Sequence, residues 1–323
     1  ARVARPARMN IMYAKPKPIE ISPGRTKAAR QPLVSISNPV MRAATAIPIL
    51  PKMPLIASGT PSNRPPSPAA KRLSAASALA GALGAEYYEF DVDALVQGYV
   101  ETVEGAIGRK LSWQDDDIAL QNIQARTRAP GIWLLANLRQ ALLLATSNRS
   151  EAAVGYTTMD GDTCGGISPI AGIDKAFLRT WLEWMEEDGP EGNEAMPALR
   201  AINEQQPTAE LRPPEQGQTD ESDLMPYTVL DAIERLAIRD KLTPVEIYQS
   251  LAGEHDSGQL AAWIRRFFQL WARNQWKRER YAPSFHLDDE NLDPKTWCRF
   301  PILSGGFERE LKQLEQLVQS DGK

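Results

Sequence analysis

The sequence predicts an α/β fold in which a parallel sheet is followed by a helical C-terminal part. Two observations predict the sheet: an aromatic strand pattern over residues 86–92 and a short apolar run over residues 142–145, with helical sequence between them. A third observation is a change of composition near Arg72. It divides the chain into two expected domains, a basic segment over residues 1–72 and a folded domain over residues 73–323.

The segment over residues 1–72 differs from the rest of the 323-residue chain in charge and in proline content. It holds 13 Lys+Arg and one acidic residue, Glu20, so its net charge is +12, whereas the remainder carries 24 Lys+Arg against 40 Asp+Glu, a net of -16. It also holds 13 of the 25 prolines, which interrupt helices and central strands, so we expect disorder. The alternatives are a basic arm that contacts nucleic acid, a transit peptide and an out-of-frame translation. Tyr13 is the only aromatic residue there that could stack on bases.

The composition also excludes several classes of protein. Cys164 and Cys298 are too few and too far apart for a disulfide framework or a cysteine-rich zinc site. No run approaches the roughly 18 apolar residues of a membrane span, so we expect a cytoplasmic protein without membrane contact. His255 and His286 lie in polar stretches, which does not favour a metal role for either.

The folded domain begins with a helix and a strand. The stretch over residues 71–83 is rich in Ala and Leu, which favours a helix, and Gly84 is a residue at which helices commonly stop. The strand pattern over residues 86–92 follows directly.

A second helix and strand come next. Residues 115–128 have acidic residues at the N-terminal end of a helical pattern, and Pro130 is expected to bend or break this helix before residues 132–138 resume it. The apolar run over residues 142–145 suits a buried parallel strand. Because ligands bind at the carboxyl ends of strands in open α/β sheets, we expect the chemistry in residues 146–151.

Beyond residue 174 the pattern becomes helical. Residues 175–185 carry apolar side chains at helical spacing, which we assign to a core, and Thr243-Pro244-Val245-Glu246 is an N-cap sequence. Residues 190–223 show no period and are expected to form a long loop, either functional or disordered. One apolar stripe then leads into the basic stretch over residues 273–280. Its members are Leu260, Ile264, Phe267, Phe268 and Trp271.

Polar residues between positions 122 and 175 suggest a site for an anionic nucleotide with magnesium. Arginine forks bind phosphate or carboxylate in two places at once, and lysine supplies a compact positive charge. A Glu and an Asp on neighbouring loops can hold Mg²⁺ beside substrate phosphates. The competing interpretations are solvated ion pairs for the arginines, a helix cap for the glutamate and a surface position for the lysine. The residues concerned are Asn122, Arg126, Arg128, Thr146, Glu151, Asp162 and Lys175.

The order and spacing of these residues resemble the NAD+ synthetase family. Three runs of sequence carry the resemblance: N-I-Q-A-R-T-R from Asn122, T-S-N-R-S-E from Thr146 with its continuation to Lys175, and P-T-A-E-L from Pro207. The similarity extends over roughly residues 78–308 and includes the Asp220-Glu221 pair. The motif T-S-N-R-S-E and the long C-terminal helices resemble those of the glutamine-dependent bacterial branch.

This resemblance implies a fold, a reaction and a set of binding residues. The fold is a Rossmann-like parallel sheet of the adenine nucleotide alpha hydrolase type, here without its first strand. The reaction is the ATP- and Mg²⁺-dependent amidation of deamido-NAD+ to NAD+ through an adenylated intermediate, with ammonia as the nitrogen donor, in a homodimer. Arg126 and Thr146 would contact ATP, and Glu151 would bind Mg²⁺. Lys175 and Thr208 would contact the nucleotide phosphates as catalytic residues. Asn122 and Asp162 would bind deamido-NAD+.

Two departures from the family pattern bear on activity. The family's S-G-G-x-D-S loop, which cradles pyrophosphate, does not occur before Ala78, and Ser304-Gly305-Gly306-Phe307 is better explained as a turn before a final helix. The glutaminase domain of the larger synthetases is also missing, so a separate domain or subunit would have to supply ammonia. Three functions follow: an NAD+ synthase that uses ammonia, an inactive synthetase fragment with a structural or dimerisation role, and, ranked last, a nucleic-acid-binding protein.

Overall fold

The structure is a computed structural model that describes residues 8–13, 68–190, 194–209, 211–212, 219–302 and 304–321. Most of the basic segment over residues 1–72 lies outside these residues, and its expected disorder stays a prediction. What is described there is strand β1 (Arg8–Tyr13) and the beginning of helix α2 (Pro68–Ala82). The chain divides into two units, which are described one at a time.

The smaller unit contains residues of Asn10–Phe90 together with Thr180–Gln205. Strand β2 (Glu86–Asp91) pairs with β1 in a two-stranded sheet. Helix α2 packs against the short helices η1 (Pro197–Leu199) and α7 (Arg200–Asn203). The helix expected over residues 71–83 and the strand over residues 86–92 are therefore confirmed. The loop expected over residues 190–223 contains these short helices and α8 (Asp220–Asp223).

The larger unit contains Asp91–Arg179 and Gln206–Lys323. It begins with α3 (Asp93–Ile107) and α4 (Asp117–Arg139). Of the two outcomes expected at Pro130, a break is wrong, because α4 runs through this residue without interruption, and a bend stays a prediction. A proline removes one backbone donor from a helix, and Pro130 is exposed within α4. The helix ends at Arg139, and the next residue, Gln140, has a left-handed conformation and donates its backbone N–H to carbonyls of the last turn.

The strand expected over residues 142–145 is reduced to a single parallel bridge between Leu144 and Ile167. Two backbone bonds support the bridge: Ala145 N donates to Ile167 O at 2.9 Å, and Gly166 N donates to Leu143 O at 2.8 Å. A buried strand needs neighbours on both sides, yet the side chain of Leu144 is 51% exposed. Among the described residues, the expected parallel sheet is therefore represented by isolated bridges, and the fold is mostly helical.

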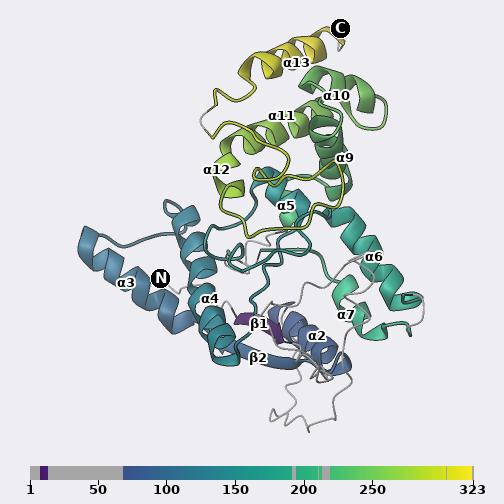
Figure 1. The fold of residues 1–323 in the computed structure, drawn as a ribbon. Coiled ribbons are helices and arrows are strands. Elements are labelled where there is room, and N and C mark those ends of the chain that lie inside the picture. The colour runs from purple at the N-terminus through teal and green to yellow at the C-terminus, as the bar shows by residue number, and fades with distance from the viewer. Residues whose placement is uncertain are drawn as a thin grey trace, which may run out of the picture. The chain divides into compact units, whose positions relative to one another are not determined.

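The core of the larger unit is formed by its C-terminal helices (Figure 1). The short helix α5 (Arg149–Val154) contacts α9, α11 and α12. All five members of the apolar stripe expected from the sequence are at most 3% exposed, so this prediction is confirmed. The described helices include none with the length and apolar character needed to cross a bilayer. The remaining helices are α6 (Lys175–Glu187), α9 (Tyr227–Ile238), α10 (Pro244–Leu251), α11 (Ser257–Arg273), α12 (Gln275–Arg278) and α13 (Glu308–Asp321).

Candidate functional site

Helix α5 carries Glu151 at its third position, where the carboxylate has two roles. The side chain of Asn148 accepts a hydrogen bond from Glu151 N at 3.0 Å, and Glu151 Oε2 accepts one from Asn148 N at 3.3 Å, which completes a capping box. The other oxygen, Oε1, lies 3.0 Å from Lys175 Nζ at the start of α6. Glu151 therefore caps a helix, as one of the two interpretations expected, and also pairs with Lys175, whereas its binding of Mg²⁺ stays a prediction.

A second carboxylate lies close to this ion pair. Asp220 is 5% exposed and accepts a hydrogen bond from Tyr227 Oη to its Oδ2 at 2.9 Å, whereas its buried Oδ1 has no hydrogen-bond partner. The Nζ of Lys175 lies 5.7 Å from the centre of the Tyr227 ring. Burial raises the pKa of Asp220, the positive charge of Lys175 lowers it, and the negative charge of Glu151 raises it. The four side chains thus belong to one electrostatically coupled group.

The residues on α4 approach the loop that follows α5. The hydroxyl of Thr158 donates to Asn122 Oδ1 at 3.1 Å, and the backbone N–H of the same threonine donates to Asp162 Oδ1 at 2.8 Å. Arg126 Nε donates to the carbonyl of Met159 at 3.0 Å. Asn122, Arg126 and Asp162, which are far apart in sequence, therefore meet at the same short loop.

Asp162 is the most perturbed acid in this part of the site. The surrounding protein atoms displace solvent from around Asp162, and this desolvation raises the pKa of its carboxyl group to about 6. Part of the residue is nevertheless accessible to solvent. The hydrogen bond from Thr158 N and the nearby charge of Arg128 oppose this shift, whereas the charge of Glu151 adds to it. Burial lowers the pKa of the Arg128 guanidinium, and its buried Nε has no hydrogen-bond partner. Solvent access beside buried charges is typical of a binding cleft.

Two further predicted residues, Thr146 and Thr208, lie beside the segments that carry the site. Thr146 is exposed, just before α5, and no hydrogen bond to its side chain is found in the described part of the chain. Thr208 follows Pro207, whose carbonyl accepts a hydrogen bond from Asp220 N at 3.2 Å, so the backbone beside Thr208 runs past the second carboxylate. Residues 210 and 213–218 are not among the residues that the structure describes.

The structure adds three residues that sequence reasoning did not select. Tyr227 aligns Asp220, as described above. Tyr281 Oη lies 2.8 Å from the Thr157 hydroxyl, and burial raises its pKa. Lys277 Nζ donates to the carbonyls of Gly155 and Thr157, each at 2.7 Å. The only sequence signal was the basic stretch that contains Lys277, and nothing local distinguished this lysine from its neighbours.

The donor set fits magnesium only in combination with a phosphate ligand. No group of three or more His, Cys, Asp or Glu side chains that could hold a metal occurs among the described residues. Mg²⁺, however, usually keeps several waters and takes one or two carboxylates together with substrate phosphates. Glu151 and Asp220, with its unpartnered oxygen, match that requirement, and Lys175 supplies the positive charge that phosphates need.

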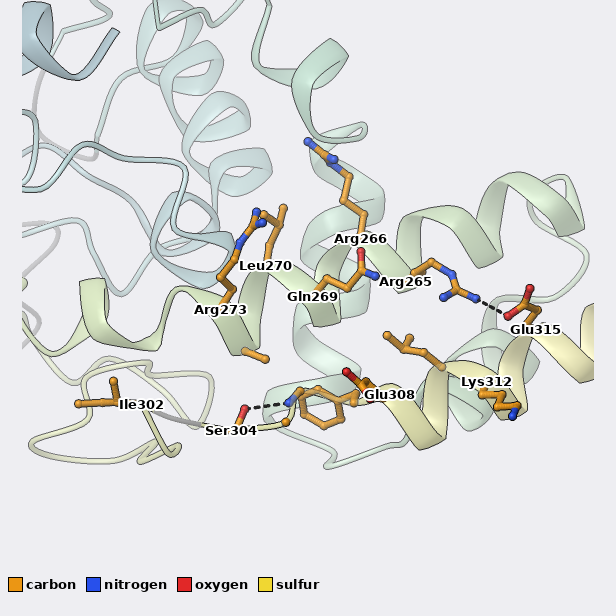
Figure 2. Close-up of a pocket in the computed structure, with 15 residues that line it drawn as sticks. Arg265, Arg266, Gln269, Leu270, Arg273, Ile302, Ser304, Glu308, Lys312 and Glu315 are labelled. Atoms are coloured by element: carbon orange, nitrogen blue, oxygen red, sulfur yellow. Dashed lines mark hydrogen bonds and ion pairs between the residues drawn. The ribbon is translucent and has the colours of Figure 1, made fainter. Parts of the chain in front are cut away.

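A separate cavity of about 890 Å³ lies between α11 and the turn that precedes α13 (Figure 2). None of the site residues described above lines it. Its charged side chains are partly engaged, because Arg265 pairs with Glu315 at 3.2 Å and Arg266 donates to the carbonyl of Asp223. In the turn, Gly306 N donates to Ser304 Oγ at 3.1 Å and Gly306 has a φ of 68°, as expected of a turn rather than of a phosphate loop.

The chain is similar to several known proteins. The family model "NAD synthase" matches residues 61–280. The "Glutamine-dependent NAD(+) synthetase" of Aquifex aeolicus is 36% identical over 72% of this chain, and that of Thermotoga maritima is 38% identical over 70%. A solved glutamine-dependent NAD(+) synthetase from Cytophaga hutchinsonii is 48% identical over 76% of this chain and 39% of its own, with a TM-score of 0.66.

The chain corresponds to only part of the length of each relative. The chain spans 37% of the length of the Aquifex protein and 36% of that of the Thermotoga protein. The family match includes every residue predicted for the site, from Asn122 to Thr208, and also Asp220 and Lys277. On this evidence the chain belongs to the NAD synthase family.

Proposed function

We propose that the chain is the synthetase part of an NAD+ synthase, which amidates deamido-NAD+ to NAD+ with ATP, Mg²⁺ and ammonia through an adenylated intermediate. The observation that carries this proposal is the Glu151–Lys175 pair, 3.0 Å apart beside the buried Asp220. Two carboxylates and one ammonium group suit a triphosphate bound with a divalent cation. The names of the relatives supply the reaction class.

The first task of the site is to hold ATP. Lys175, together with Thr208, would contact the phosphates, and Arg126 and Thr146 would contribute further contacts. Glu151 would be the main protein ligand of Mg²⁺, which when bound would neutralise charge on the phosphates. Catalysis of this kind depends mainly on positioning and on electrostatic stabilisation of the transferring group.

The second task is to present deamido-NAD+ to the nucleotide. Asn122 and Asp162 would contact this substrate, because both reach the loop at Thr158. A carboxyl group with a pKa of about 6 could hold or accept a proton near neutral pH, which suits a step in which an amine loses protons. Cys164 is a poor nucleophile, since burial and the charge of Asp162 raise its pKa to about 11, and we assign it no covalent role.

A homodimer is part of the proposal, and helix α3 supports it. Leu95, Tyr99, Val103 and Ile107 follow one another at a spacing of four residues, and each is between 47% and 58% exposed. Val96 and Val100 are the buried residues of this helix. A continuous apolar stripe on an exposed helix is typical of a surface that another chain covers.

The test is an assay of NAD+ formation by the full chain from deamido-NAD+, ATP and Mg²⁺, with ammonium or with glutamine as nitrogen source. We expect turnover with ammonium that is lost in Glu151→Gln and retained in Glu254→Gln, an exposed control on another part of the surface. No turnover with any donor would favour the alternative, an inactive fragment with a structural or dimerisation role. That alternative is favoured by one observation, the absence of an S-G-G-x-D-S sequence before Ala78.

A further inference from the structure

Two buried residues connect the helices that carry Glu151 and Lys175. Ser150 is 0% exposed and precedes Glu151 on α5, and Asp231 is 4% exposed on α9. The hydroxyl of Ser150 donates to Asp231 Oδ1 and accepts a hydrogen bond from Lys175 N at 2.8 Å. Asp231 Oδ2 accepts a hydrogen bond from Ala176 N at 3.0 Å. These three bonds form one closed connection between α5, α6 and α9.

We propose that Ser150 and Asp231 are positioning residues that set the distance between Glu151 and Lys175. They hold the backbone of Lys175 directly against the residue before Glu151, so the two charged side chains leave adjacent points of the fold. The inference rests on the proposed roles of Glu151 and Lys175 in nucleotide binding. Displacements of about 1 Å are enough to impair catalytic geometry, so a fixed connection beneath this pair matters for function.

Ordinary helix capping does not account for Asp231. The N-terminus of α6 already has a local cap, because Asp174 Oδ1 accepts a hydrogen bond from Phe177 N at 2.6 Å. Asp231 comes from another helix and binds a different backbone N–H of α6. Burying a carboxylate costs free energy unless hydrogen bonds compensate for it, and here the compensating donors are those that join the two site-bearing helices.

Helix α9 surrounds Asp231 with buried residues, which include the charged Glu234 as well as apolar side chains. Helix α9 places Leu230 and Ile233, both 0% exposed, beside Asp231 in sequence. The carboxyl group of Asp231 accepts hydrogen bonds from Ser150 and Ala176, and burial together with the nearby negative charge of Asp174 raises its pKa to about 7. Replacing either polar partner should loosen the connection while leaving the apolar packing of α9 in place.

The experiment measures how fast the amine of Lys175 is acetylated in the full chain by trace acetic anhydride, with the exposed Lys295 as internal reference and mass spectrometry as readout. Asp231→Asn keeps the shape of the side chain but removes one of its two acceptor oxygens. Ser150→Ala removes the hydroxyl. We expect both to label Lys175 roughly threefold faster than the unmodified chain, because a partly exposed ion pair contributes that order of protection. Glu151→Gln, which removes the ionic partner itself, gives the upper limit.

Ile233→Ala is the control for general loosening, since it opens the core of α9 without touching the connection. The proposal is overturned if Lys175 is acetylated in Asp231→Asn and Ser150→Ala at the rate of the unmodified chain. It is also overturned if Ile233→Ala increases the acetylation rate of Lys175 as much as these two variants do. Because the labelling needs no nucleotide, it separates this inference from the proposed function. In a parallel arm, failure of ATP with Mg²⁺ to protect Lys175 in the unmodified chain would count against the nucleotide site alone.

Discussion

Replacing Arg149 with leucine should destabilise the chain more than any single surface change. Arg149 is 4% exposed at the start of α5, and its guanidinium reaches four carboxylates on three other segments. Although burial alone would lower its pKa, these carboxylates raise it above the usual value. The contacts are Asp174 at 3.0 Å, Glu234 at 3.2 Å, Asp288 at 3.0 Å and Glu290 at 2.7 Å.

The size of the expected loss in the free energy of unfolding depends on which partners of Arg149 are buried. Asp288 is 46% exposed on its side chain and contributes less than about 1 kcal/mol. Glu234, at 1%, and Glu290, at 10%, would be left in the protein interior, and Glu290 would keep only the longer contacts to Arg235 and Arg239 at 3.4 and 3.5 Å. Removing one partner of such a buried pair costs about 3–5 kcal/mol, which is the loss we expect in the free energy of unfolding.

The loss should also depend on pH. Burial already raises the pKa of Glu234 well above its usual range, and the charge of Arg149 opposes that shift. Without the arginine the folded-state pKa rises further. A carboxyl group whose pKa is higher in the folded state contributes stability at low pH and loses it as the pH rises through the folded value. Arg149→Leu should therefore cost more at pH 8 than at pH 5.

Urea unfolding followed by circular dichroism and tryptophan fluorescence measures this loss at both pH values. Asp288→Asn is the matched control and should change the free energy of unfolding by less than about 1 kcal/mol. Arg149→Lys should fall between the two, because an ammonium keeps the charge but cannot reach several carboxylates at once. An Arg149→Leu variant within 1 kcal/mol of the original chain at both pH values would refute the reasoning.

Three further outcomes are expected. Gly155→Ala should destabilise the chain by roughly 2–4 kcal/mol in urea, since φ is 65° and the new Cβ would lie 2.4 Å from a neighbouring side-chain atom; Gly98→Ala, in a helix with open space around it, should be neutral or stabilising. Cys164, whose pKa burial raises to about 11, should react with iodoacetamide at pH 8 roughly a hundredfold more slowly than a free thiol, as mass spectrometry can measure. Val103→Glu on the exposed apolar stripe should weaken self-association in sedimentation velocity, whereas Thr102→Glu, beside the stripe, should not.

Local patterns predicted the parts of this structure that depend on neighbours in sequence. The capping box at Thr243 is formed by Thr243 and Glu246 as the sequence indicated, and the helical stripe that begins at Leu260 is buried as expected. The sequence placed Glu151 and Lys175 in one candidate site, and their side chains lie together, with Nζ and Oε1 3.0 Å apart. These signals succeed because capping and amphipathic burial are properties of one helix.

Contacts between distant segments could not be read from the sequence. The partners of Arg149 at Asp288 and Glu290 follow it by 139 and 141 residues, in a stretch without a recognisable motif. The hydrogen bond from Tyr227 to Asp220 depends on how α9 meets the preceding loop, and sequence spacing does not reveal that. The expected strand at Leu144 was lost for a related reason, because an apolar run becomes a strand only when neighbouring strands are present to pair with it.

The short helix α5 connects the core to the candidate chemistry. A six-residue helix is too short to be stable alone, so its geometry must be imposed from outside. Its C-terminal carbonyls receive that support: Asn274 Nδ2 donates to Val154 O at 2.7 Å, and Arg278 Nη1 donates to Ala153 O at 2.7 Å. Arg278 is fixed in turn against the Trp271 ring, 3.8 Å from its centre.

Both ends of α5 are therefore held by the C-terminal helices, the first through Arg149 and Asp231 and the second through Asn274 and Arg278. Glu151 lies between these two supports, with one oxygen used in capping and the other directed to Lys175. The helices that begin at residue 227 or later contain none of the residues predicted to bind substrate, yet their contacts hold both ends of the helix that carries Glu151. The same interactions that stabilise the core thus fix the candidate site, and a change in either should be detected in both.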